Sequence, residues 1–192
     1  VGGDGTVNEV ANGLMTAGRP APVLGVVPAG SGSDFARSLG VPRDPGAALT
    51  ILASGRRRPV DLGEIVCAPL DPGIGRGPVR RYFVNMAGCG GSAHVTELFN
   101  RRRIPGRLGY AVAAALTTIG YRWPRVEIRR EDGSAHPVEL NTLFVCNGEF
   151  CGGGMHVGRG ARLDDGLFLL VQASGIGRIR TMLQWPRLYS GR

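Results

Sequence analysis

The chain has 192 residues, of which 32 are glycine and 43% are hydrophobic, and this composition excludes a disordered chain, which lacks the apolar residues for a core. The net charge of +8 comes from arginine alone, so the absence of lysine excludes a P-loop lysine and a catalytic lysine. An arginine excess suits phosphate groups or anionic lipid headgroups. Nucleic acid is not expected as a partner, because the arginines are dispersed and no nucleic-acid-binding motif is present.

The first stretch, Val1–Glu9, combines three glycines, two carboxylates and a hydroxyl at the start of a helical pattern. The apolar residues of that pattern recur with the spacing of one helical face, and Gly18 ends it; they are Val7, Val10, Ala11, Leu14 and Met15. A glycine turn that opens a helix is suited to holding an anion, because the backbone N–H groups are accessible and the helix dipole favours negative charge. The alternative is an ordinary tight turn.

A second glycine loop follows Val23–Val27, which is predicted to be a parallel strand covered on both faces. The loop Pro28–Asp34 opens a short helix over Phe35–Leu39. In a doubly wound sheet such loops gather at the carboxyl ends of the strands, so the two loops are expected to converge around a polyphosphate. Asp4 and Asp34 would then face one crevice, which suits a divalent cation, although Asp34 could equally be a plain N-cap.

After a short helix over Gly46–Ala53, the run Arg56–Arg58 is interpreted mainly as a solvated patch. From Pro59 onward the sequence pattern is typical of short strands separated by turns. The first elements expected there are a hairpin of Ile65–Cys67 with Val79–Met86 around the loop Pro69–Pro78, and a third glycine loop at Ala87–Gly91. A helix over Leu108–Tyr121 and a hairpin of Val126–Ile128 with Val138–Val145 follow. The last elements are a glycine-dense corner at Cys146–Met155, a strand at Phe168–Val171 and a helix from about Ile176.

The predicted fold class is therefore α/β, with two parts. Residues 1–58 are expected to form an incomplete, doubly wound nucleotide-binding domain, and residues 59–192 an antiparallel, β-rich, sandwich-like domain. The functional crevice is expected between them. The chain begins inside a strand–loop unit and stops after an unfinished helical pattern, so we expect a fragment that lacks both ends.

The two glycine motifs resemble those of a known family. Gly2-Gly3-Asp4-Gly5-Thr6 with Asn8-Glu9, followed by Pro28-Ala29-Gly30-Ser31-Gly32-Ser33-Asp34-Phe35-Ala36-Arg37, is similar to the catalytic domain of the diacylglycerol kinase and sphingosine kinase family, particularly its bacterial lipid kinases. The first motif is shared with NAD kinases, whereas the second is more specific to the lipid kinases. The resemblance continues through nearly the whole chain.

The resemblance implies a set of ligands and residue roles. It assigns ATP to Gly3, Asp4, Gly5, Thr6, Asn8, Glu9, Gly30 and Ser31. It also implies a Mg²⁺ network that includes Asp4, Asp34 and Asp165, with carbonyl oxygens from Arg162 and Leu167 beside Asp165; taken alone, Asp164–Gly166 is an ordinary turn. Asp4 is the expected catalytic carboxylate, although bacterial diacylglycerol kinases attribute the base to a glutamate further toward the C-terminus, beyond where this chain ends.

The expected function is that of an ATP-dependent kinase that transfers the γ-phosphoryl group to a hydroxyl of diacylglycerol, a sphingoid base or a related lipid. The alternatives are an NAD kinase and a non-catalytic nucleotide- or lipid-binding module; the module stays open because Ser33 and Ser92 stand where many members have Asn and Asp. Four cysteines without a C-x-x-C pair, no signal peptide and no run of 18 apolar residues predict a cytoplasmic protein that meets its lipid peripherally at a membrane surface. A homodimer is left open.

Overall fold

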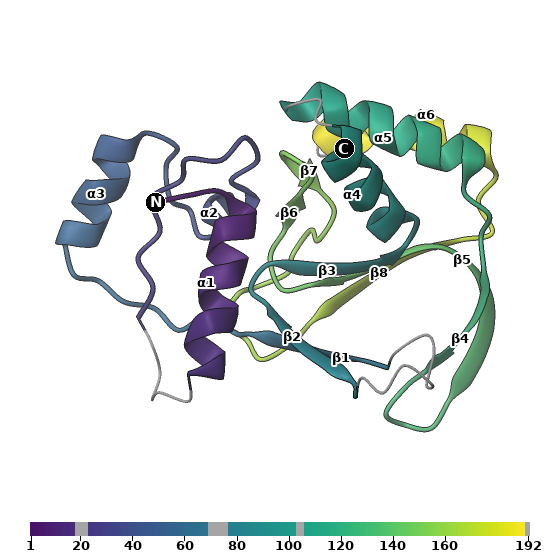
Figure 1. The fold of residues 1–192 in the computed structure, drawn as a ribbon, viewed down its shortest axis with the longest axis horizontal. Coiled ribbons are helices and arrows are strands. Elements are labelled where there is room, and N and C mark those ends of the chain that lie inside the picture. Colours follow the sequence, from purple (N-terminus) through teal and green to yellow (C-terminus); the bar gives the residue numbers. More distant parts are fainter. Residues whose placement is uncertain (18–22, 69–76, 103–105, 191–192) are drawn as a thin grey trace.

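The structure is a computed structural model that describes residues 1–17, 23–68, 77–102 and 106–190. The first part of the chain carries three helices, α1 (Asp4–Thr16), α2 (Asp34–Ser38) and α3 (Pro45–Ala53), which gather at one end of the molecule (Figure 1). Within the described ranges, no helix is long and apolar enough to cross a bilayer.

One apolar core joins this helical part to the rest of the chain. Val7 and Ala11 form the buried face of α1 and pack in one cluster with Phe35 of α2 and with Val84 and Leu163 from the second half. The spacing of Val7 and Ala11 is the helical spacing seen in the sequence, and burial of that stripe is what stabilises α1. The mixed α/β class predicted for the chain is confirmed, whereas the doubly wound arrangement of the first part and the domain boundary near residue 58 stay predictions.

The prediction of a buried strand at Val23–Val27 is wrong. Among the described residues, one isolated parallel bridge forms at the end of this segment, between Gly2 and Pro28. It is supported by hydrogen bonds from Gly2 N–H to the Val27 carbonyl (3.1 Å) and from Ala29 N–H to the Gly2 carbonyl (3.0 Å). Val23 is 66% exposed, whereas Val26 and Val27 are buried, so only the end of the segment next to Pro28 is covered. A parallel ladder needs an extended neighbour, and the residues after Gly2 turn at once into α1.

The second part is built on antiparallel strands. β1 (Gly63–Cys67) and β2 (Val79–Phe83) form the predicted hairpin, whose tip lies mostly outside the described residues. The long β5 (Ala135–Cys146) pairs with β4 (Arg125–Arg129) along its first half and lies between β3 (Met86–Gly90) and β8 (Leu169–Ser174) along its second half. The predicted hairpin around the turn after Arg130 and the strand predicted from Phe168 are confirmed, with β8 displaced slightly toward the C-terminus.

The third glycine loop, predicted at Ala87–Gly91, is instead strand β3, which pairs from Met86 opposite Cys146 to Gly90 opposite Thr142. Strand pairing uses backbone groups only, so glycines do not prevent it when a long partner is available. The glycines also permit close packing: a β-carbon on Gly91 would lie 2.8 Å from the carbonyl oxygen of Asn141.

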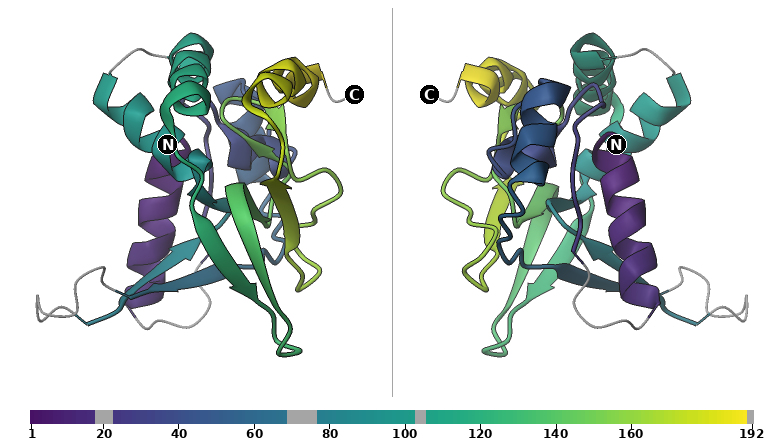
Figure 2. Two further views of the ribbon diagram at one scale, coloured as in Figure 1. Left: turned by 90° about the vertical axis from the view of Figure 1, so that its right-hand side faces the viewer. Right: turned by 90° about the vertical axis from the view of Figure 1, so that its left-hand side faces the viewer.

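Three helices lie over one face of this sheet: α4 (Gly91–Arg102), α5 (Gly106–Gly120) and α6 (Arg178–Ser190) (Figures 1 and 2). The helices predicted from Leu108 and from about Ile176 are thus confirmed as α5 and α6. The glycine-dense corner at Cys146–Met155 contains two short paired strands, β6 (Phe150–Cys151) and β7 (Met155–His156). The β-rich, sandwich-like class predicted for the second part is confirmed.

Candidate nucleotide site between two glycine loops

The two glycine loops meet at Gly3 and Gly30. A β-carbon on Gly30 would lie 2.4 Å from the Cα atom of Gly3, a separation that no side chain tolerates. Gly2 also hydrogen-bonds to residues on both sides of Pro28. The predicted convergence of the two loops is therefore confirmed, and it depends on residues without side chains at the point of contact.

Asp4 is the first residue of α1, and it connects the two loops directly. Its Oδ1 accepts a hydrogen bond from the backbone N–H of Phe35 in the first turn of α2 (2.9 Å). A β-carbon on Gly32 would lie 2.9 Å from Oδ2 of Asp4 and 3.3 Å from Oδ2 of Asp34. The two carboxylates thus approach the same point beside Gly32, as predicted, and the missing side chain of that glycine leaves space between them.

Asp34 is buried, with only 4% of its surface exposed. Its Oδ2 accepts a hydrogen bond from Gly153 N–H (2.7 Å), whereas Oδ1 has no hydrogen-bond partner in the described part of the chain. Burial, aided by the negative charge of Asp4, raises the pKa of this carboxyl, and the Gly153 N–H and Arg37 oppose the rise. The N-cap interpretation of Asp34 is wrong, because Ser33 is the N-cap and Asp34 contacts a distant loop instead.

A pH series tests this assignment. A carboxyl whose pKa is raised by folding binds its proton more tightly in the folded chain, so its contribution to the free energy of unfolding falls as the pH rises above 3.8. Asp34→Asn removes that titration and keeps an oxygen for the Gly153 N–H. We expect the variant to gain stability relative to wild type between pH 3.8 and neutrality, measured by urea unfolding.

Asp132→Asn is the contrasting variant for that series. The backbone N–H of Ser134 donates to Oδ1 of Asp132 (2.8 Å), and the proximity of Ser134 holds the pKa of this carboxyl below the ordinary value. This contribution is present above pH 3.8 and is lost as the pH falls through the lowered pKa, so Asp132→Asn should lose stability relative to wild type as the pH rises in the acid range. If the stability of Asp34→Asn relative to wild type stays flat or falls as the pH rises, folding does not raise the pKa of the Asp34 carboxyl, and the assignment is wrong.

Two contacts at this site have no motif in the sequence. The Nη2 atom of Arg43 donates to the carbonyl oxygens of both Ser31 (2.6 Å) and Gly32 (3.0 Å). The positively charged guanidinium group therefore lies beside the second loop. Gly153 belongs to a run of three glycines with positive φ, from Gly152 to Gly154, a backbone region that favours glycine. In the sequence, only the glycine density of this run indicated that its backbone could approach another part of the site closely.

The other residues expected at ATP lie in the first turns of α1 and in the second loop. Gly5 and Thr6 are exposed in the first turn, Ser31 is exposed in the loop, and Asn8 is half-buried with its carbonyl accepting from Asn12 (2.9 Å). Glu9 is exposed and lies 3.7 Å from Arg81 in an ion pair. These five positions are accessible to a ligand, and their contact with ATP stays a prediction.

Asp165 lies in a turn that contacts Asp61. Its Oδ1 accepts from Leu167 N–H (3.1 Å), and the N–H of Gly166 donates to Oδ2 of Asp61 (2.6 Å). The Arg162 side chain pairs with Asp164 at 3.7 Å. Over the described ranges, no three Asp, Glu, His or Cys side chains gather closely enough to hold a metal. The structure therefore brings Asp4 and Asp34 together, and the participation of Asp165 in a shared network stays a prediction.

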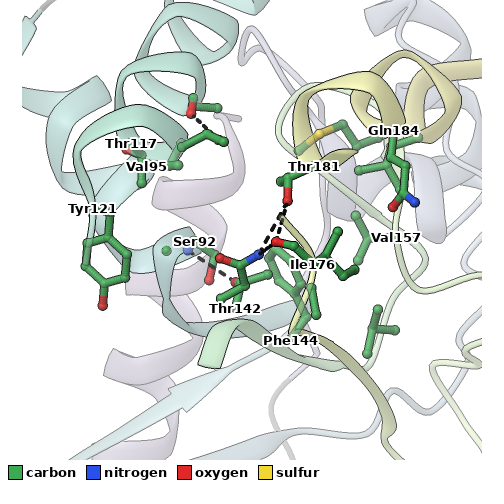
Figure 3. Close-up of a pocket in the computed structure, with 18 of the residues that line it drawn as sticks. Ser92, Val95, Thr117, Tyr121, Thr142, Phe144, Val157, Ile176, Thr181 and Gln184 are labelled. Atoms are coloured by element: carbon green, nitrogen blue, oxygen red, sulfur yellow. Dashed lines mark hydrogen bonds between the residues drawn. The ribbon is translucent and has the colours of Figure 1, made fainter. Parts of the chain in front are cut away.

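An apolar cavity of about 310 Å³ lies between the sheet and the three helices above it (Figure 3). Its lining includes Val95 and Ala114 from α4 and α5, Phe144 and Val171 from the sheet, and Leu188 from α6. Figure 3 shows Thr142 and Phe144 on the sheet side and Thr181 and Gln184 on α6. Such a cavity suits an apolar ligand with few polar groups.

The cavity wall is connected to Asp34 through one peptide group. Tyr189, which lines the cavity, donates its hydroxyl hydrogen to the carbonyl oxygen of Gly152 (3.0 Å). The N–H of that same peptide group, on Gly153, donates to Asp34. A hydrogen bond to the carbonyl polarises the amide and strengthens its N–H as a donor. One peptide group thus connects the wall of the cavity with the buried Asp34 carboxylate.

Comparison with known families matches both parts of the chain. Residues 1–65 match the model of the diacylglycerol kinase catalytic domain, and residues 85–192 match that of the YegS C-terminal NAD kinase beta sandwich-like domain. The chain belongs to the diacylglycerol kinase and YegS family. The resemblance noted in the two glycine motifs is therefore confirmed.

Individual members of the family are similar over nearly the whole chain. The chain is 34% identical over 186 residues to a probable lipid kinase YegS-like protein of Chromohalobacter salexigens, covering 95% of this chain and 55% of that one. It is 34% identical over 177 residues to the diacylglycerol kinase of Bacillus subtilis, covering 88% and 52%. The crystal structure of a diacylglycerol kinase from Bacillus anthracis matches with a TM-score of 0.64 at 25% identity, covering 99% and 56%. The chain thus spans about half the length of these relatives.

Ser33 stands where the resemblance noted in the sequence leads one to expect Asn, and its backbone conformation is one that suits Asn. Its φ is +51°, the left-handed region that Asn tolerates better than most residues. The Ser33 hydroxyl donates to the Gly30 carbonyl oxygen (3.0 Å) and closes the second loop on itself. The serine therefore retains a structural role in shaping the loop.

Proposed function

We propose that the chain is part of an ATP-dependent lipid kinase that transfers the γ-phosphoryl group of ATP to a hydroxyl of diacylglycerol, a sphingoid base or a related lipid. The observation that carries this proposal is the meeting of Gly3 with Gly30 and of Asp4 with Asp34 beside Gly32. The names of the relatives, lipid kinase and diacylglycerol kinase, support the reaction class.

The phosphates would lie at the start of α1 and along the second loop. The first intrahelical hydrogen bond of α1 runs from Val7 N–H to Gly3, so the N–H groups of Asp4, Gly5 and Thr6 need partners from outside the helix. An anion at a helix N-terminus satisfies such groups. The side chains of Asn8 and Glu9, and Gly30 and Ser31 opposite, would complete the nucleotide site, with Arg43 adding positive charge.

The carboxylates of Asp4 and Asp34 fit a divalent cation, because carboxylate oxygens are the ligands that Mg²⁺ prefers and Oδ1 of Asp34 is buried without a protein partner in the described ranges. The family resemblance adds Asp165, with the carbonyl oxygens of Arg162 and Leu167. When bound, the cation neutralises charge on the phosphate oxygens. The backbone N–H of Phe35 holds Oδ1 of Asp4, so Oδ2 faces the space beside Gly32. In this position Oδ2 of Asp4 would accept the proton of the lipid hydroxyl.

A transfer assay tests the proposal. The full-length protein is incubated with Mg²⁺ and γ-labelled ATP, together with phosphatidylglycerol vesicles that contain diacylglycerol or sphingosine, and in parallel with NAD. We expect the label in lipid. Label in NAD alone would establish the NAD kinase alternative, and nucleotide binding without transfer to any acceptor would favour the non-catalytic module.

A further inference from the structure

The end of α5 and the start of α6 meet at one edge of the apolar cavity. Tyr121 and Trp123, which follow α5, and Ile176, which precedes α6, all line the cavity. Arg178 joins the two segments: its Nη2 donates to the Tyr121 carbonyl oxygen (3.5 Å), and its guanidinium lies 5.9 Å from the Trp123 ring centroid. Figure 2 shows α5 and α6 above the same face of the sheet.

Large apolar side chains are exposed along this edge. Ile179 is 76% exposed, Leu183 is 71% exposed, and Ile119 near the end of α5 is 58% exposed. Ile179 and Leu183 are four residues apart on α6, so they lie on the same face of that helix. Isolated exposed apolar residues are ordinary, but several around the edge of an apolar cavity indicate an interaction surface.

The two sequence segments that form this edge carry charge of one sign. Residues 106–126 and 166–192 contain no aspartate or glutamate, whereas they contain seven arginines, which include Arg122, Arg178 and Arg180. These three are exposed, and the two helices therefore present positive charge together with apolar side chains. Basic residues interspersed with exposed apolar residues suit the interface of an anionic bilayer, where the arginines meet the headgroups and the apolar side chains enter the acyl boundary.

We propose that this edge, named here the α5–α6 edge and made up of Ile119, Arg122, Arg178, Ile179, Arg180 and Leu183, docks on an anionic lipid bilayer. The docking brings the apolar cavity, which Tyr121 and Trp123 line at the same edge, to the membrane surface. The proposal rests on the proposed lipid kinase function, because it identifies the face through which that site would receive a membrane lipid.

Vesicle sedimentation of the full-length protein tests the docking face without nucleotide. The vesicles are phosphatidylcholine with or without phosphatidylglycerol. We expect the double variant Ile179→Asp/Arg180→Glu to bind anionic vesicles about tenfold more weakly than wild type, because it introduces charge among the apolar residues and reverses one arginine. Neither residue lines the cavity as described, and both are exposed, so the fold should be unchanged.

The matched control is Leu49→Asp/Arg57→Glu, which makes the same chemical changes at exposed positions on and after α3. The control should bind within about twofold of wild type. Equal weakening by both double variants, or none by the α5–α6 edge variant, would overturn the docking proposal.

Transfer assays separate this proposal from the proposed function. Transfer to a water-soluble short-chain diacylglycerol should be equal in wild type and the edge variant, whereas transfer to vesicle-embedded diacylglycerol should fall with vesicle binding. Equal transfer to vesicle-embedded lipid would overturn the docking proposal. A wild-type protein that phosphorylates no lipid would overturn the kinase proposal instead, and sedimentation would still decide where the protein docks.

Discussion

Asp4→Asn is expected to reduce phosphoryl transfer by about 10²–10⁴-fold, the usual contribution of a positioned acid–base group. The substitution removes the negative charge and the ability to accept a proton. It keeps the oxygen that accepts from Phe35 N–H at 2.9 Å, so the link between α1 and α2 should persist. Initial rates with saturating lipid, together with the urea midpoint, measure the two effects separately.

Asp44→Asn is the matched control for Asp4→Asn. Asp44 also accepts a backbone hydrogen bond at the start of a helix, from Ala47 N–H at 2.8 Å, but it caps α3 and is exposed. The same loss of charge there should leave transfer unchanged. If Asp4→Asn retained wild-type transfer, Asp4 would have only a structural role at the start of α1 and the assignment of the catalytic carboxylate would be wrong.

Gly30→Ala is expected to reduce the free energy of unfolding by about 1–3 kcal/mol and to abolish tight nucleotide binding, because an added methyl group must separate the two loops. The new β-carbon would lie 2.4 Å from the Cα atom of Gly3, and backbone cannot rotate away as a flexible side chain can. Urea unfolding and calorimetric titration with Mg·ADP measure the two losses.

Gly13→Ala is the control for Gly30→Ala. Gly13 lies within α1, and a β-carbon there would meet no described atom within 4 Å outside its own turn and neighbours. Because alanine favours helix over glycine, the variant should be more stable by about 0.5–1 kcal/mol, with nucleotide binding unchanged. Wild-type stability and binding in Gly30→Ala would show that the loops do not require their close contact.

The sequence predicted five of the six helices in the described chain, the hairpins and the two glycine loops, because each depends on residues near one another in the chain; α4 (Gly91–Arg102) was not predicted. The sequence also placed Asp4 and Asp34 in one crevice; the expected strand before the second loop is not formed, and the two loops meet through Gly3 and Gly30 instead. The strand at Val23–Val27 was wrong because its apolar pattern does not reveal whether a partner strand is present. Local pattern likewise could not show that the glycines of β3 pair with β5.

The contacts that complete the site join distant residues. Asp4 binds a backbone N–H 31 residues away, and Asp34 accepts from Gly153, 119 residues away. No spacing rule connects such positions, and a glycine run alone is as typical of a flexible corner as of a close approach. Arg43 was missed because a single arginine in a loop carries no motif. Its two bonds to loop carbonyls become visible only in the folded chain.

The most direct test of the account is which backbone amides respond to nucleotide. Amide NMR shifts of the full-length protein are recorded during titration with Mg·ADP. We predict that Gly3 and Gly5 at the start of α1 shift together with Gly30 and Gly32 in the second loop, at one common affinity, while Gly133 in the β4–β5 turn stays unchanged. Shifts confined to one loop, or none in either, would contradict a nucleotide site formed by both.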